Sequence, residues 1–171
     1  MIASAADQAE AAAGQAGAGV LGIPNISPKT HLSTDYLNHF NEAMMVLDIL
    51  STSSDCLEDF LAWRPRSYVE HFAGSGFSDR HMVVDAYEAA DPNLRRTLDQ
   101  LSDRMNALLT RTRDVMRADP GAARQQALAR EAAAGLKPLI YEAAALINGT
   151  PAEPSSSKGG PQSAIDALFS R

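Results

Sequence analysis

The sequence predicts an all-α fold, a helical bundle of about five or six helices with one long central helix and flexible termini. Every long run of apolar residues in it repeats at intervals of three or four, which is the spacing of one helix face. Several of these runs follow residue types that cap helices. No stretch alternates between apolar and polar residues as a half-buried strand does.

Composition divides the 171-residue chain into four parts. Residues 1–30 are mostly Ala, Gly and Ser and hold too little apolar surface to offset the entropy of ordering them, so we expect a flexible arm. Residues 31–148 contain the apolar repeats and form the predicted helical bundle. Residues 149–161 are dense in Pro, Gly and Ser, which is typical of a solvated tether. Residues 162–171 form an amphipathic peptide motif.

The first predicted helix follows a cap at Ser33 or Thr34 and carries a regular apolar stripe. The stripe consists of Tyr36, Phe40, Ala43, Leu47 and Leu50. Three short helices are expected next, from Asp55 to Arg64, from Ser67 to Gly74 and from Ser78 to Tyr87. In the second of these, Ser67 and Glu70 have the spacing of a capping box, in which each side chain bonds the other residue's backbone N–H.

The longest helix is predicted over residues 92–117. Asp91 is its cap and Pro92 takes the first helical position, where the missing N–H of proline costs nothing. At 1.5 Å per residue this helix is a rod of about 39 Å.

A last helix is expected to begin at Asp119-Pro120. Gly135 and Pro138 lie inside it and are expected to kink it. Its inward face is predicted to hold Leu136, Ile140, Ala143 and Ile147.

The charge of the chain argues against two classes of partner. It has 15 Lys and Arg against 21 Asp and Glu, a net charge of −6, which disfavours non-specific binding to nucleic acid or to an anionic membrane. The single Cys56 cannot form an internal disulfide or a thiolate metal site. Together with the lack of a basic start followed by an apolar block, this predicts a cytoplasmic protein.

Charge is also uneven along the chain. Residues 31–91 hold three basic and eleven acidic side chains, whereas residues 92–130 hold eight and four. The favoured interpretation is that the long helix pairs with the first helices inside one bundle, or that both faces are solvated. The alternative is an arginine-rich face for an acidic partner.

Polar side chains are densest on the first helix. A helical projection places His39 at the edge of the apolar face, so the favoured role is that of a core-edge histidine with a hydrogen-bond partner. The alternative is a phosphate-accepting histidine, which would have to protrude into solvent. Met45 and Ile49 fall on the polar side, where either the bundle or a second chain must cover them, so a homodimer is one possibility.

The segment from Trp63 to Phe77 is rich in aromatic residues and is expected to form core. A second interpretation is that Arg64 and Arg66 clamp a phosphate or a carboxylate. No metal site and no cofactor are predicted, because the chain has no Glu-x-x-His or His-x-x-x-His pair.

The carboxyl end carries the clearest functional pattern. Ile165, Leu168 and Phe169 are spaced by three and four and therefore share one face of a two-turn helix. Such a helix is too short to persist alone and is expected to fold on a partner, in the helix-in-groove mode. A tether of about 12 residues reaches roughly 20 Å, so the partner is either another molecule or this protein's own body.

The residues Gln162, Ile165, Asp166, Leu168 and Phe169 carry a resemblance to a known segment. They resemble the short N-terminal segment of flagellar motor switch proteins that docks on the chemotaxis response regulator CheY. The tail is also similar in placement to the tethered helix of the chemotaxis phosphatase CheZ. The resemblance implies that these five residues bind a receiver-domain response regulator or a flagellar switch component.

That phosphatase uses an Asp-x-x-x-Gln motif, and no Asp in this sequence has Gln four residues later. The nearest substitutes are two acid–amide pairs, Asp103 with Asn106 and Asp35 with Asn38. The leading hypothesis is therefore a non-enzymatic or weakly enzymatic regulatory or scaffold protein of bacterial signalling. The alternative is phosphoryl-transfer chemistry, in which His39 accepts phosphate or an acid–amide pair speeds receiver dephosphorylation.

Overall fold

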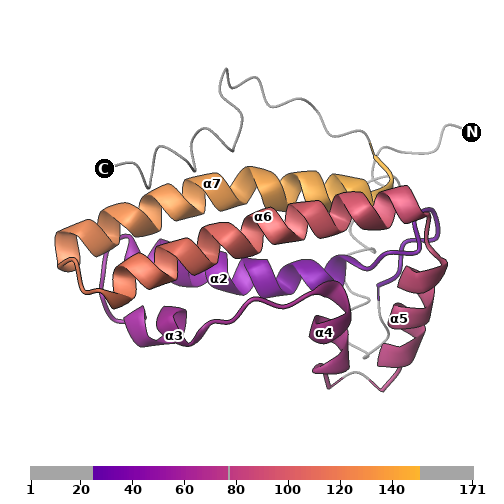
Figure 1. Cartoon of the computed structure of the whole chain (residues 1–171), viewed down its shortest axis with the longest axis horizontal. Coiled ribbons are helices and arrows are strands. Elements are labelled where there is room, and N and C mark those ends of the chain that lie inside the picture. The colour runs from indigo at the N-terminus through magenta and orange to yellow at the C-terminus, as the bar shows by residue number, and fades with distance from the viewer. Residues whose placement is uncertain (1–24, 77, 151–171) are drawn as a thin grey trace, which may run out of the picture.

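A computed structural model describes residues 25–76 and 78–150 (Figure 1). The all-α prediction is confirmed, since these residues contain six α-helices, one 3-10 helix and no strand beyond an isolated bridge between Ile26 and Ser33. The helices are η2 (Thr34–Leu37), α2 (Asn38–Leu50), α3 (Leu57–Ala62), α4 (Tyr68–Ala73), α5 (Arg80–Ala89), α6 (Pro92–Arg117) and α7 (Ala122–Asn148). The predicted tail motif and most of the predicted arm and tether lie outside the described residues.

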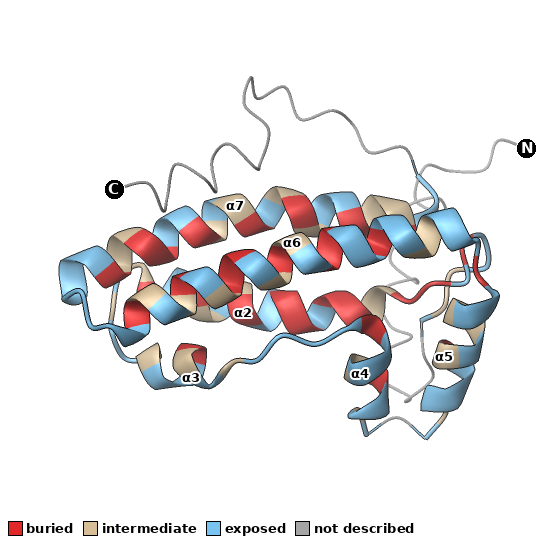
Figure 2. Ribbon diagram, in the orientation of Figure 1, coloured by how far each residue is buried: buried red, intermediate tan, exposed pale blue. Residues whose placement is uncertain are grey.

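Three long helices make the body. Helix α7 packs against both α6 and α2, and the three run lengthwise side by side (Figure 1). The short α3 lies against α2 and α6, and α4 packs on α5 and η2 at one end of the body. Buried residues form stripes along the facing sides of the long helices (Figure 2).

The stripe of α6 shows why the longest helix forms as predicted. Leu98, Leu101, Met105 and Leu108 are all buried at helical spacing. Fully burying one such side chain contributes about 1.5–3 kcal/mol. The helix spans residues 92–117, the bounds that its sequence predicts.

Two predicted helix starts are confirmed in atomic detail. The Asp91 carboxylate accepts hydrogen bonds from the backbone N–H groups of Asn93 and Leu94, at 2.7 and 3.3 Å. In α4, the Ser67 hydroxyl accepts from the Glu70 N–H at 3.2 Å, and the Ser67 N–H donates to the Glu70 carboxylate at 2.8 Å. These bonds satisfy N–H groups that the helix itself leaves without partners.

Some helices begin later than predicted. Helix α7 begins at Ala122 rather than at Asp119-Pro120, because Asp119 and Gly121 adopt positive φ angles of 51° and 87°. Helix α3 begins at Leu57 rather than Asp55, whose N–H bonds the Ser53 hydroxyl in the preceding turn.

Neither Gly135 nor Pro138 interrupts α7. Pro138 leaves the carbonyl of Ala134 without an N–H partner, but Ala134 is exposed, so water can bond that oxygen. Gly135 faces α6, and a Cβ atom there would lie 3.3 Å from Cδ2 of Leu108. Glycine therefore permits the close approach of the two longest helices.

The predicted flexible arm includes residues 25–30, and of these Lys29 and Thr30 lie at the end of α7. Thr30 is buried, and its hydroxyl donates a hydrogen bond to the carbonyl of Ile147. Two residues further on, Leu32 is fully buried in the core. The chain thus enters and leaves the described body at the same corner.

We predict that Gly135→Val lowers the free energy of unfolding by about 1–3 kcal/mol, although valine is a better helix former than glycine. The cause is overlap with Leu108. Urea unfolding followed by circular dichroism measures the change. Ala134→Val, one position along on the exposed side of α7, is the control and should cost less than about 1 kcal/mol. Equal losses in both variants would contradict the close-approach argument.

Candidate functional site

A groove of about 750 Å³ lies between α2 and α7. Residues from η2, α2 and α7 line it: Thr34, Asp35, Leu37, Asn38, Asn41, Met44, Asp48, Ser51, Arg130, Ala133, Ala134, Lys137, Ile140, Tyr141 and Ala144. On each helix these positions recur every three or four residues, because that spacing keeps side chains on one face. The groove is therefore built from the faces of α2 and α7 that flank their line of contact.

The groove combines an apolar floor with charged rims. Asp48 lies on the α2 side, and Arg130 and Lys137 lie on the α7 side. Arg130 donates a hydrogen bond to the Ser51 carbonyl at 2.9 Å, which closes one end. Within the described residues, Asp48 and Lys137 have no ion-pair partner within 4.0 Å. Both charges are free to meet a ligand.

One predicted acid–amide pair lies at this groove. Asp35 and Asn38 both line it, and the Asn38 side chain is exposed. The Asp35 carboxylate accepts the Asn25 N–H at 3.1 Å, which holds it near the entrance of the chain. This pair is accessible to a partner.

The second acid–amide pair lies elsewhere, on α6. The Asn106 amide donates to the carbonyl of Arg66 at 3.4 Å, and its Oδ1 atom is buried without a hydrogen-bond partner in the described part of the chain. Asp103 is exposed. Asn106 is therefore engaged with the loop before α4, which leaves it poorly placed to orient a water molecule on a receiver.

His39 is buried more deeply than its predicted position at the edge of the apolar face, with only 5% of its surface exposed. Its ring stacks on Trp63 with centroids 5.0 Å apart, and the His71 ring lies 5.9 Å away. Burial, with smaller effects of His71 and Arg66, lowers the pKa of His39 to about 4. Its Nε2 atom has no partner among the described residues. The ring therefore does not protrude into solvent as a phosphate-accepting histidine must.

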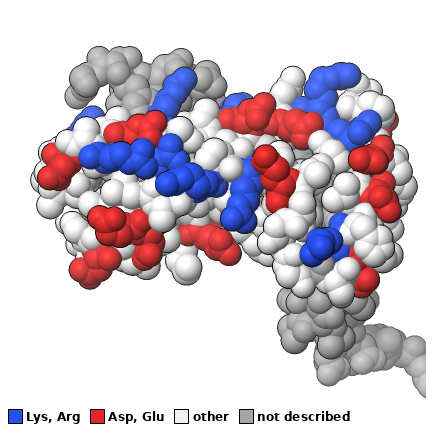
Figure 3. All heavy atoms as spheres, turned by 60° about the horizontal axis from the view of Figure 1, so that its bottom comes forward, with Lys and Arg blue, Asp and Glu red and all other residues white. Residues whose placement is uncertain are grey.

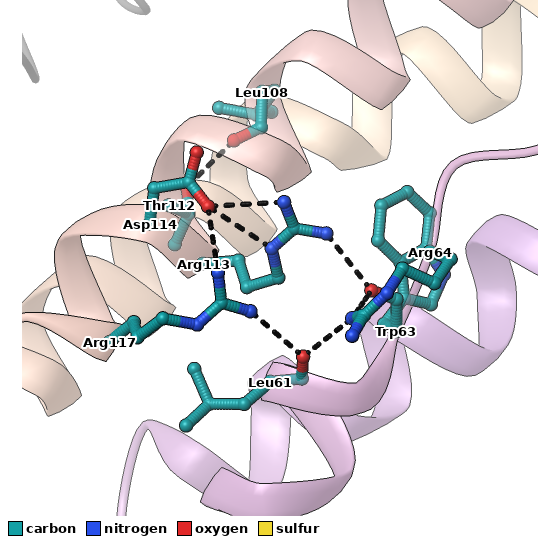
Figure 4. Close-up of polar contacts among 8 residues, drawn as sticks. All are labelled: Leu61, Trp63, Arg64, Leu108, Thr112, Arg113, Asp114 and Arg117. Carbon is teal, nitrogen blue, oxygen red and sulfur yellow. Dashed lines mark hydrogen bonds and ion pairs between the residues drawn. The ribbon is translucent and has the colours of Figure 1, made fainter.

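Arg64 is used inside the molecule. Its guanidinium donates to the carbonyls of Leu61 and Trp63, both at 2.8 Å (Figure 4). From α6, Arg113 donates to the Trp63 carbonyl at 3.1 Å and Arg117 to the Leu61 carbonyl at 3.4 Å. Carbonyls at a helix end lack helical partners and favour cations. These arginines cap α3 and tie it to α6, an arrangement that opposes the anion-clamp interpretation for Arg64.

Two of the basic residues of the long helix, Arg113 and Arg117, thus donate hydrogen bonds to backbone carbonyls inside the molecule. Asp114 adds contacts of 3.1 Å to Arg113 and 3.6 Å to Arg117. On this side of the molecule, basic side chains form a band with acidic side chains beside it (Figure 3). The surface has mixed charge, which disfavours a wholly basic docking face.

Met45 and Ile49 remain exposed, at 59% and 40% of their surface. The described part of the bundle does not cover them, which contradicts the first alternative, cover by the bundle. An interface with a second chain stays a prediction. Tyr141, on the rim of the groove, is exposed at 66%. Large exposed apolar side chains are thus present on both of the helices that form the groove.

Across residues 25–76 and 78–150, no three His, Cys, Asp or Glu side chains cluster as metal ligands would. In that part of the chain, no helix combines the length and the apolar character needed to span a bilayer.

No protein-family model, no curated protein and no solved structure matches this chain.

The sequence alone does not predict the groove. Its two walls are about 90 residues apart in the chain, and only tertiary packing brings them together. The sequence feature that points to this wall of the groove is the pair Lys137 and Tyr141. These two residues lie four positions apart, and so on one helix face, in a segment that is otherwise rich in alanine.

We predict that the protein loses stability as the pH falls from about 6.5 to 4. Because the pKa of His39 is lowered to about 4 in the folded state, the unfolded chain takes up the proton first. The loss is on the order of 2 kcal/mol. Urea unfolding at several pH values measures it. His39→Phe should flatten this pH dependence, whereas His81→Gln, at an exposed position, should not. An unchanged slope in His39→Phe would refute the assignment.

Proposed function

We propose that this chain is a cytoplasmic regulatory or scaffold protein of bacterial signalling that binds a receiver-type response regulator or a flagellar switch component. The observation that carries the proposal is the resemblance of residues 162–169 to the regulator-docking segment of motor switch proteins. In this view Ile165, Leu168 and Phe169 are the apolar anchors, and Gln162 and Asp166 supply the polar contacts.

The placement of this segment relative to the body supports the proposal. Helix α7 ends at Asn148, where Gly149 takes the left-handed conformation that stops a helix. In the sequence, the docking segment follows the last helix of the bundle after a tether of about 12 residues. A docking segment attached in this way recruits its partner to the bundle.

The geometry of the candidate residues supports binding over phosphotransfer. His39 is buried against Trp63, and Asn106 bonds the Arg66 carbonyl. Neither group is presented to a second protein. His39 belongs to the core, and Asn106 bonds the loop before α4.

Binding through the tail can be tested with the full chain and purified receiver domains. Saturable binding is expected, strengthened by a phosphoryl mimic such as beryllofluoride. Phe169→Ala should weaken it about tenfold or more, since a buried aromatic anchor often dominates such an interface. Ser170→Ala is the matched control and should bind normally. Fluorescence anisotropy or calorimetry reads out the affinity, and no saturable binding to any receiver removes the proposal.

A second candidate is a receiver phosphatase that uses Asp35 and Asn38. The observation favouring it is that both side chains line an open groove. In that case the full chain speeds the loss of phosphate from a receiver, and Asn38→Ala abolishes the effect. Asn148→Ala, an exposed amide at the end of α7, should leave the rate unchanged. If the rate of dephosphorylation is the same with and without the chain, only binding remains.

A further inference from the structure

The α2/α7 groove has the properties of a helix-binding site. It is open and about 750 Å³ in volume, within the range of ligand pockets. Leu37, Met44 and Ile140 line it, together with alanines of α7. An amphipathic helix with apolar residues on one face is the ligand that such a groove fits.

We propose that this groove binds the chain's own C-terminal segment, residues 162–169. Ile165, Leu168 and Phe169 would pack on its floor. The inference goes beyond the proposed function and does not require that a receiver domain exists as a partner.

Chain length is the first argument. Along α7, Lys137 lies 12 positions before Gly149, a distance of about 18 Å. The 12 residues from 150 to 161 reach roughly 20 Å when they behave as a Pro/Gly/Ser linker. A segment that turns back after this linker arrives beside Lys137 and Tyr141, in the middle of the groove.

Charge order is the second argument. A segment running antiparallel to α7 places Asp166 near Lys137, a cation with no ion-pair partner in the described residues. Further along it directs Arg171 toward the end closed by Arg130 and Ser51, where Asp48 lies. Asp166 then faces a cation, and Arg171 lies near Asp48 as well as near Arg130.

Exposed apolar residues are the third argument. Tyr141 borders the groove and Met45 lies on the neighbouring face of α2, and both leave more than half of their surface uncovered by the described body. A helix seated in the groove would cover part of this surface.

Seating of the tail hides its three anchors from any other protein. A receiver and the groove then compete for one segment, so the apparent affinity for a receiver falls by the fraction of chains with a seated tail.

The full chain tests the proposal in solution. In a Cys56→Ser background, Ser170→Cys carries a nitroxide spin label, and amide signals of the ¹⁵N-labelled chain report which residues lie near it. We expect broadening at residues 38–48 and 133–144 that does not depend on protein concentration. Leu168→Asp should remove it, while Ser163→Ala should not. No broadening there, or broadening confined to other helices, overturns the proposal.

A charge exchange adds a second test. Lys137→Glu should reduce the broadening severalfold, and Asp166→Lys in the same chain should restore it. Arg124→Glu, at an exposed position of α7 outside the groove, should have no effect. Failure of the double variant to recover the signal contradicts the proposed orientation.

Two further results distinguish intramolecular binding of the tail from binding of a second copy's tail and from receiver binding. Broadening that grows with concentration, or that appears between labelled and unlabelled chains, assigns the groove to a second copy's tail and overturns intramolecular binding. Loss of receiver binding alone rejects the proposed function and leaves the groove assignment standing. A seated tail in a chain that also binds receivers supports both.

Discussion

The packing of α7 against two helices at once is the constraint on which the rest of this structure depends. One side of α7 contacts α6 and another contacts α2, and its buried positions include small residues such as Ala129 and Ala132 beside Leu136. Small residues let helix axes approach closely, while the leucines fill the space between them. The α2/α7 groove is the outer edge of the same packing, so a change that separates these helices would alter the core and the groove together.

The features predicted most reliably from the sequence are local. The caps at Ser67 and Asp91 depend on residues a few positions apart, and the sequence places both correctly. The start of α7 depends on a positive φ at Asp119, which residue type alone does not dictate. For the candidate site, the sequence names Asp35 and Asn38 but not Lys137 or the other groove wall, because their proximity follows from packing between distant segments.

Tyr36 and Tyr68 hydrogen-bond to the backbone at the side of the bundle, whereas Nε2 of His39 and Nε1 of Trp63 are buried without a partner in the described residues. Tyr36 donates to the Arg66 carbonyl at 2.8 Å, and burial raises the pKa of Tyr36 to about 12. Tyr68 accepts the Ser33 N–H at 2.8 Å. Together with the arginines that cap α3, these bonds fix the segment between α3 and α4 without a long helix. Trp63 takes part in this network through its carbonyl, and its ring stacks on His39.

The contact between Thr30 and the carbonyl of Ile147 has a mechanical consequence. Because the chain enters and leaves the body at one corner, tension applied between its two ends does not act along the bundle. It acts first on this hydrogen bond and on the last turn of α7, which can peel away one contact at a time. A body held in this way should yield at low force from its ends, yet resist stretching along the axes of its helices.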